Sequence, residues 1–170
     1  LRLPGIATEL LIALGLYAQW HRVDADKARL LAILFSFSPL SLIFAFTLTD
    51  TGCMLFAAAS YFAAAQALHV SARTSRQHPA SAYGWAALAG VGLGLAFLSK
   101  YFAVFLGLAY LIHFFLVQRS AWRLGVVLVV LAIPFGLLNL YWNLTHCWTN
   151  LLFNLVNRNR GDAGIQWLDV

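Results

Sequence analysis

Charge is what this sequence lacks most. Only 10% of its 170 residues are charged, whereas 62% are hydrophobic, and a soluble domain would carry about a quarter charged residues. Because so few polar side chains cannot cover a water-facing surface, the composition predicts a membrane protein. The net charge is +5, but the basic residues are scattered at the ends of apolar runs. They form no stripe, which argues against nucleic acid as a partner.

Motifs for soluble catalysis and metal binding are also missing. The two cysteines, Cys53 and Cys147, have no chelating neighbour at metal-type spacing, so we interpret both as packing residues and predict no metal ligands. No Ser/His/Asp order or phosphate loop occurs. "GVGLG" (residues 90–94) follows no strand and lies in an apolar run. Gly90 and Gly94 form a GxxxG pair, which predicts close helix packing.

Apolar segments follow one another along most of the chain. A bilayer-spanning helix needs about 20 apolar residues, and helices satisfy their own backbone in lipid. We therefore predict an all-α, polytopic transmembrane bundle over residues 1–141, with an outer-face loop segment at 142–170. The six expected spans are residues 4–20, 30–48, 52–70, 83–99, 101–117 and 124–141. Pro39 and Pro134 should kink their spans, and the serines at 36, 38 and 41 are available to bond freed carbonyls.

The basic residues predict the orientation of these spans. If Leu1 lies outside, seven basic residues fall in inner loops and four fall outside, as the positive-inside rule favours. The seven are Arg22, Lys27, Arg29, Arg73, Arg76, Arg119 and Arg123, and the four are Arg2, Lys100, Arg158 and Arg160. Asp50, Lys100 and the C-terminal segment then share the outer face. Since the chain begins at Leu1 without a methionine, we expect it to be a piece of a larger membrane protein.

Asp50 is the lone charge in "LIFAFTLTDTGCMLFAAAS", and two interpretations of it stay open. It would cap the helix that Thr51 and Gly52 begin, or it would line an outer-face site, because ionisable residues near the membrane core are functional candidates. Lys100, in "LSKYF", would either extend to lipid headgroups or hold a substrate phosphate. Arg2 has the same two interpretations.

The C-terminal segment "YWNLTHCWTNLLFNLVNRNRGD" mixes aromatic, amide and basic side chains. Trp and Tyr at the end of a span are typical of an interface anchor. Alternatively, Asn143, His146 and Arg158 would line a sugar pocket. Glu9 lies a turn or two inside the first span, where it would face a water-filled cavity or pair with a residue outside this chain.

Several motifs occur in an order that suggests a family. They are an entry "RLP", an "SP" in the second span, a "TD" that opens the next helix, then "GLAFLSK" and a "WNLTHCW" segment. In this order they resemble bacterial membrane glycosyltransferases of the GT-C superfamily, in particular the protein O-mannosyltransferase-like group that includes lipid A aminoarabinose transferases. The resemblance covers most of the chain, and it rests on the order and spacing of motifs that are weak singly.

This resemblance implies a function and roles for particular residues. It implies transfer of a sugar from a polyprenyl-phosphate donor to a lipid, glycan or protein acceptor, on the periplasmic face of a bacterial inner membrane. Asp50 matches a catalytic acid of an outer loop, more as a supporting carboxylate than as the base. Lys100 and Arg2 match positions near the donor phosphate. The loop that carries the family's principal acidic pair should precede Leu1, so this piece alone is expected to be inactive.

Two other classes of function remain alternatives. A transporter or flippase for lipid-linked substrates would favour polar sites at mid-membrane and broken helices, whereas the polar residues here lie at span ends. A non-catalytic assembly subunit could share the fold. The sequence names neither the sugar nor the acceptor, and it predicts no certain cofactor, leaving open whether a divalent metal is needed.

Overall fold

The computed structural model describes residues 3–21, 23–39, 41–43, 51–73 and 79–148, and every regular element in these ranges is helical. The expectation of an all-α fold is therefore confirmed. Short 3₁₀ turns at Tyr101–Ala103 and Arg119–Ala121 and a π-helical turn at His113–Val117 join the last helices. The α-helices are α1 (Leu3–Trp20), α2 (Ala25–Ser36), α4 (Thr51–Ala72), α5 (Ala80–Ser99), α6 (Val104–Ile112) and α7 (Trp122–Thr145).

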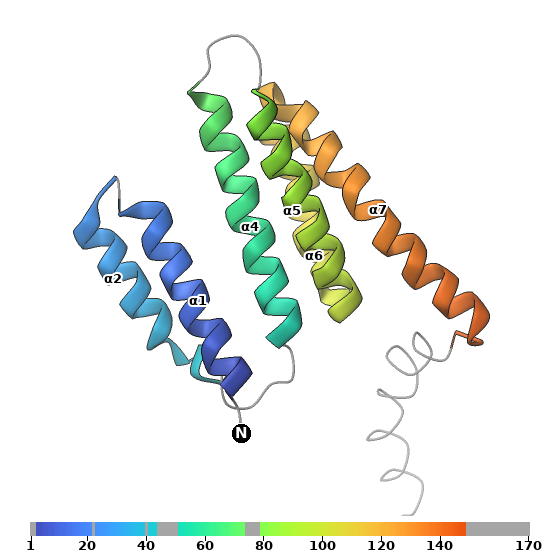
Figure 1. Ribbon diagram of the computed structural model, residues 1–170, viewed down its shortest axis with the longest axis horizontal. Helices are drawn as coiled ribbons and strands as arrows, with labels where there is room; N and C mark the ends of the chain where they lie inside the picture. The colour runs from blue at the N-terminus through green and yellow to red at the C-terminus, as the bar shows by residue number, and fades with distance from the viewer. Residues whose placement is uncertain (1–2, 22, 40, 44–50, 74–78, 149–170) are drawn as a thin grey trace, which may run out of the picture.

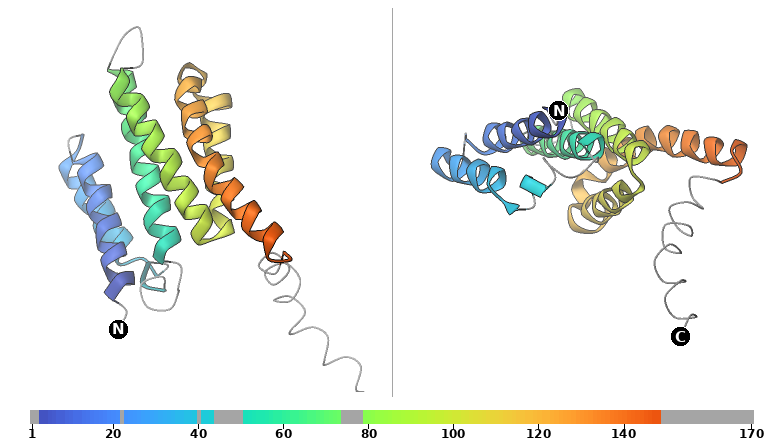
Figure 2. Two further views of the ribbon diagram at one scale, coloured as in Figure 1. Left: turned by 45° about the vertical axis from the view of Figure 1, so that its right-hand side comes forward. Right: turned by 90° about the horizontal axis from the view of Figure 1, so that it is seen from below.

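The helices alternate in direction, so that the bundle has two distinct ends (Figures 1 and 2). We call one the Lys100 end: it holds the first residues of α1 and α4 and the last residues of α5 and α7. The opposite one, the Arg73 end, holds the turn between α1 and α2 and the last residues of α4. Alternation follows from a chain that returns after each span, as the charge pattern of the sequence predicted.

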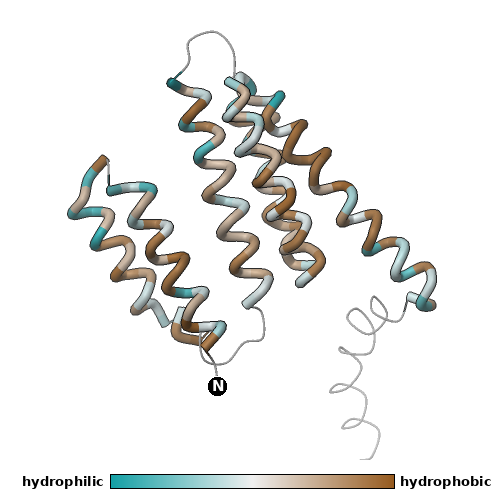
Figure 3. Tube along the Cα trace, viewed as in Figure 1, coloured by the Kyte–Doolittle hydropathy of each residue, from teal (hydrophilic) through white to brown (hydrophobic). Residues whose placement is uncertain are grey.

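Three stretches are long and apolar enough to cross a membrane: Thr51–Ala72, Ala80–Ser99 and Arg119–Thr145, and Tyr101–Val117 is a shorter apolar one. Brown, hydrophobic residues run along most of α7 in Figure 3. Only 17% of the most apolar window in Arg119–Thr145 is buried. Apolar surface left outside a helical core fits a lipid environment, so the fold is a membrane helical bundle.

The second expected span, residues 30–48, is broken rather than kinked. Helix α2 ends at Ser36, and a new helical turn begins at Ser38, whose hydroxyl accepts a hydrogen bond from the Ser41 N–H at 3.1 Å. Pro39 follows directly, in the first helical position, where a missing N–H costs nothing. "SFSP" thus encodes a stop and a capped restart. Ser36 bonds the Ala32 carbonyl of its own helix at 2.9 Å, which is not a carbonyl that Pro39 frees.

Small residues bring α4, α5 and α7 close together. Gly92 faces α4, and a Cβ there would lie 3.1 Å from backbone atoms of Ser60. Gly90 and Gly94 face α7, where a Cβ would overlap Leu128 and Phe135. These contacts confirm the packing interpretation of "GVGLG", because only glycine permits such approach. The fully buried Ser60 joins the helices further: it donates to the Ala89 carbonyl of α5 at 2.7 Å.

Candidate active site at the Lys100 end

The first turn of α4 packs against the last turn of α5. A Cβ added at Gly52 would lie 3.3 Å from the Ser99 hydroxyl oxygen, so a larger residue at position 52 would push the two helix ends apart. The Ser99 hydroxyl donates to the Leu95 carbonyl of its own helix at 2.9 Å, and its Cβ and oxygen are the atoms that face Gly52. Gly52 and Ser99, which lie about fifty residues apart in sequence, therefore meet at one end of the bundle.

Lys100 occupies a tight reversal between α5 and the 3₁₀ turn that leads into α6. Its backbone is extended (φ −160°, ψ 133°), its N–H donates to the Ala96 carbonyl at 2.9 Å, and its own carbonyl accepts from Ala103 at 3.1 Å. The ammonium lies 5.5 Å from the centre of the Phe102 ring, within cation–π range. These contacts fix where the lysine side chain leaves the bundle and place a cation at the helix end.

Tyr101, the next residue, was not singled out from the sequence. Its hydroxyl oxygen is buried, and among the residues that the structure describes it has no hydrogen-bond partner. The ring packs edge-on against Phe97 at 5.7 Å between centroids, which holds it in place. A buried hydroxyl without a partner costs about 1–3 kcal/mol, so a polar partner is expected for this group beyond the described residues. Only its position beside Lys100 in "LSKYF" could have suggested it.

Glu9 adds a carboxyl group near the same end, on α1. It is 9% exposed, and the buried Ser41 hydroxyl hydrogen-bonds its side chain. The other carboxyl oxygen, Oε2, has no partner within the described ranges. The Ser38 and Ser41 hydroxyls also bond each other, at 2.9 Å between oxygens. Glu9 is therefore linked by hydrogen bonds to the capped helical turn that follows α2.

The end of α7 carries the sequence-predicted Asn143 and His146. Asn143 is buried at 2% exposure, and its amide donates to the Asn139 backbone carbonyl at 2.8 Å and side-chain oxygen at 2.9 Å. Its own side-chain oxygen has no partner in the described part of the chain. The exposed His146 ring stacks on Trp142 at 3.8 Å between centroids. The Asn143 amide is therefore used within α7, and the stacked Trp142 and His146 rings are exposed at the end of this helix.

The last residues of α7 lie away from Lys100. In both Figure 1 and the left view of Figure 2, α7 diverges from α5 as it approaches this end. A reversal with left-handed φ values at Cys147 (53°) and Trp148 (57°) stops the helix, and Trp148 donates to the Asn143 carbonyl at 2.8 Å. Cys147 is exposed in this turn, so its prediction as a packing residue was wrong. The predicted site residues Lys100 and His146 therefore lie at separate helix ends.

The other predicted site residues, Asp50, Arg2 and Arg158, lie outside the described residues, so their interpretations stay predictions. Gly52 and Leu3, which are near Asp50 and Arg2 in sequence, both belong to the Lys100 end. No three His, Cys, Asp or Glu side chains gather into a metal-type group within the described ranges, and we assign no metal ligand there.

Apolar helices that alternate in direction, with Lys100 and the buried Tyr101 hydroxyl where α5 ends, define a multi-pass membrane protein. The family model described as dolichyl-phosphate-mannose-protein mannosyltransferase matches residues 1–142, and the chain belongs to this family. It is thereby a glycosyltransferase-type membrane protein of the GT-C kind. No curated protein and no solved structure matches the chain.

Proposed function

We propose that the protein transfers a sugar from a polyprenyl-phosphate donor to a lipid, glycan or protein acceptor. The reaction takes place at the Lys100 end, on the periplasmic face of a bacterial inner membrane. Family membership supports the sugar-transfer class. The distribution of basic residues supports the orientation, because seven of eleven fall in loops assigned to the opposite side.

The contact between Gly52 and Ser99 carries this proposal. It brings the start of α4, which follows Asp50 in the chain, to the end of α5, which precedes Lys100. A cation for the leaving phosphate and a carboxylate for the acceptor are the two groups that this chemistry requires. The packing of Gly52 against Ser99 supports a shared site for Asp50 and Lys100, which are fifty residues apart in the sequence.

The chemistry divides between these groups. The acceptor oxygen forms a bond to the anomeric carbon of the sugar, and the bond from that carbon to the donor phosphate oxygen breaks. The electron pair leaves with the phosphate, so negative charge grows there, and a preorganised cation lowers the barrier. Lys100 and Arg2 are assigned this role. Asp50 is assigned the supporting carboxylate, which orients the acceptor or the group that receives its proton.

His146 and the buried Asn143 at the end of α7, together with Arg158, are assigned to a substrate pocket. Because α7 diverges from α5 at this end (Figure 1), its residues stand away from the phosphate-binding lysine. A substrate that extends from the reacting carbon would be needed to reach both. The pocket therefore suits the sugar ring or the acceptor rather than the donor phosphate.

The test is sugar transfer by the full-length protein in membranes, supplied with a panel of polyprenyl-phosphate sugars. Asp50→Asn and Lys100→Ala should each reduce kcat/KM at least tenfold at equal protein level. This corresponds to loss of one charge-assisted contact, about 1.4 kcal/mol or more. Arg123→Ala is the matched control, since Arg123 stacks near Trp122 at the Arg73 end and should leave turnover unchanged.

Three outcomes would contradict parts of the proposal. Unchanged turnover in Asp50→Asn would make Asp50 a helix cap only. Unchanged turnover in Lys100→Ala would return Lys100 to a headgroup-binding lysine. Absence of transfer with every donor, together with movement of a lipid-linked sugar between leaflets, would favour the transporter; absence of both would favour the assembly subunit.

A further inference from the structure

A cleft of about 680 Å³ opens at the Arg73 end, on the far side of the bundle from the proposed active site. Its walls are the last turns of α1 and α4, completed by Trp85 of α5 and by Gln118, which precedes the 3₁₀ turn Arg119–Ala121. Residues far apart in the chain thus enclose one space. Neither the family match nor the sugar-transfer proposal assigns it a role.

The lining of this cleft has the composition of an anion site at a membrane interface. Arg73 and His69 provide a cation and a titratable imidazole, and Gln19, Gln66 and Gln118 provide three amides. No carboxylate is among the lining residues. Trp20 and Trp85 are both exposed on its rim, where tryptophan is favoured at the level of lipid headgroups. An anion would therefore meet attraction here and no repulsion from the walls.

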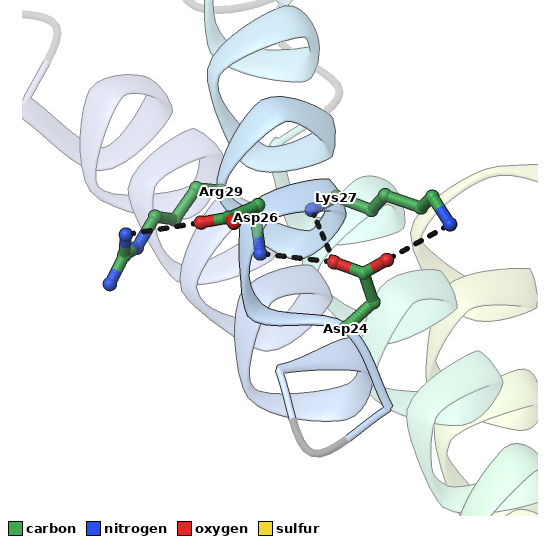
Figure 4. A network of polar contacts seen from close by, with 4 residues as sticks. All are labelled: Asp24, Asp26, Lys27 and Arg29. Carbon is green, nitrogen blue, oxygen red and sulfur yellow. Dashed lines mark hydrogen bonds and ion pairs between the residues drawn. The ribbon is translucent and has the colours of Figure 1, made fainter.

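Charge pairing nearby sharpens this contrast. On the first turn of α2, Lys27 pairs with Asp24 at 2.9 Å and Arg29 pairs with Asp26 at 3.4 Å (Figure 4). These four charges cancel within one helix turn. Within the described ranges, Arg73 has neither an ion pair nor a hydrogen bond to balance it. Arg73 thus contributes an unbalanced positive charge to the wall of the cleft, whereas the charges on α2 are paired.

Gln19 supplies a second, independent observation. Its side-chain oxygen is buried and has no hydrogen-bond partner among the described residues. An amide oxygen only accepts, so the missing partner must be a donor such as a hydroxyl or ammonium group. An ionised phosphodiester has no O–H group of its own, so a ligand bound to Arg73 through one needs a donor on another group to reach this acceptor. The complementary ligand carries both an anionic phosphate and a hydrogen-bond donor.

We propose that the cleft binds the headgroup of an anionic glycerophospholipid, with phosphatidylglycerol as the best chemical match. Its phosphodiester would contact Arg73, and its glycerol hydroxyls would donate to Gln19 and bond the other amides. The acyl chains would run along the apolar outer surfaces of α1 and α4. Basic pockets between membrane helices on the inner side are known to hold such headgroups. The site is independent of the sugar-transfer proposal, because it lies at the opposite end of the bundle.

Lipid retention measured on the full-length protein tests this inference. The protein is reconstituted in nanodiscs of phosphatidylcholine mixed with phosphatidylglycerol, then extracted mildly, and the lipid that stays bound is counted by native mass spectrometry. Wild-type protein should retain phosphatidylglycerol in preference to phosphatidylcholine. Arg73→Ala should reduce this preference by roughly five- to tenfold, as expected for one cation at a lipid surface.

Two further variants separate the cleft from general surface charge. Arg123→Ala removes a basic residue at the same end that does not line the cleft, and it should retain phosphatidylglycerol as wild type does. Gln19→Leu keeps the charge and removes the acceptor. It should lower retention of phosphatidylglycerol more than retention of phosphatidic acid, whose headgroup has no glycerol hydroxyls.

The outcomes are decisive in either direction. Equal loss in Arg73→Ala and Arg123→Ala would overturn the proposal in favour of diffuse electrostatic attraction. Unchanged retention in Arg73→Ala would also overturn it, because Arg73 would then contribute nothing to lipid binding. Because Arg73 is exposed just beyond the last turn of α4, its removal should leave folding intact, and the thermal midpoint of each variant checks this directly.

Discussion

The buried contact between Ser60 and Tyr110 gives the sharpest prediction about stability. Ser60 is fully buried on α4, and its one hydroxyl hydrogen goes to the Ala89 carbonyl at 2.7 Å. The Tyr110 hydroxyl, 3.1 Å away on α6, must then be the donor in its bond to Ser60. A single oxygen thus connects three helices. Ser60→Ala removes that oxygen and leaves the tyrosine hydroxyl, on a residue 7% exposed, without a described partner.

The expected cost of Ser60→Ala is about 1–2 kcal/mol in the free energy of unfolding. An unsatisfied buried hydroxyl costs about 1–3 kcal/mol, while hydrogen bonds between membrane helices average nearer 0.6 kcal/mol. Tyr110→Phe removes the donor but leaves Ser60 bonded to Ala89, so it should cost less, about 0.5–1 kcal/mol. In the Tyr110→Phe background, Ser60→Ala should cost less than it does in wild type, because no hydroxyl is then stranded.

Reversible unfolding in detergent micelles, read as a double-mutant cycle, measures these values. Ser36→Ala is the matched control, because the Ser36 hydroxyl bonds a carbonyl of its own helix, Ala32. Such back-bonding contributes little to stability, and the control should stay within about 0.5 kcal/mol of wild type. The reasoning is refuted if Ser60→Ala costs no more than Ser36→Ala, or if the costs of Ser60→Ala and Tyr110→Phe simply add.

Three further predictions concern the helices that frame the two ends. Gly90→Ala should lower the free energy of unfolding by about 1–3 kcal/mol, because its Cβ would overlap Leu128. Gly84→Ala, whose Cβ would have nothing within 4 Å, should be neutral or stabilise the protein by up to about 1 kcal/mol. Equal effects of the two substitutions in unfolding assays would contradict this. Ser38→Ala should cost about 1 kcal/mol through loss of the cap on the Ser41 N–H, and an unchanged unfolding midpoint would argue against the capped restart. The backbone N–H of Lys27, then its side chain, lower the pKa of Asp24. Because its folded pKa is lowered, ionised Asp24 stabilises α2 fully above the unfolded pKa of about 3.9, and this stabilisation is lost as the pH falls through the folded pKa. Amide exchange in the first turn of α2 should therefore accelerate only below a pH of about 3.9. Asp24→Asn should remove this pH dependence.

The helices themselves could be predicted from apolar run length. The described residues are all-helical as expected, because a segment that crosses a bilayer must satisfy its backbone internally. The second range failed at Ser38. The prediction of a proline kink did not consider that Ser38, directly before Pro39, can cap a helix. The bond between the Ser38 hydroxyl and the Ser41 N–H favours the end of α2 and a new helical turn over one bent helix.

Contacts across the bundle were less accessible to sequence reasoning. Gly90 and Gly94 were predicted to pack closely, yet nothing in the sequence named α7 as their partner or Ser60 as the neighbour of Gly92. The buried hydroxyl of Tyr101 and the unpaired oxygen of Gln19 could not be found either. Burial of a side chain depends on which helices pack around it, and the local sequence does not specify these helix pairs.

By itself, the sequence determined that the protein is an all-α membrane bundle, and it predicts the number of spans and the side on which each charge falls. These depend on short-range properties, namely hydropathy over a helix length and the placement of basic residues in loops. The tertiary structure alone decided that the start of α4 and the end of α5 meet at Gly52 and Ser99, that the α7 end stands apart, and that Arg73 lines a cleft. Each of these depends on helix pairing, which is set by how small and large side chains interlock between segments far apart in the chain.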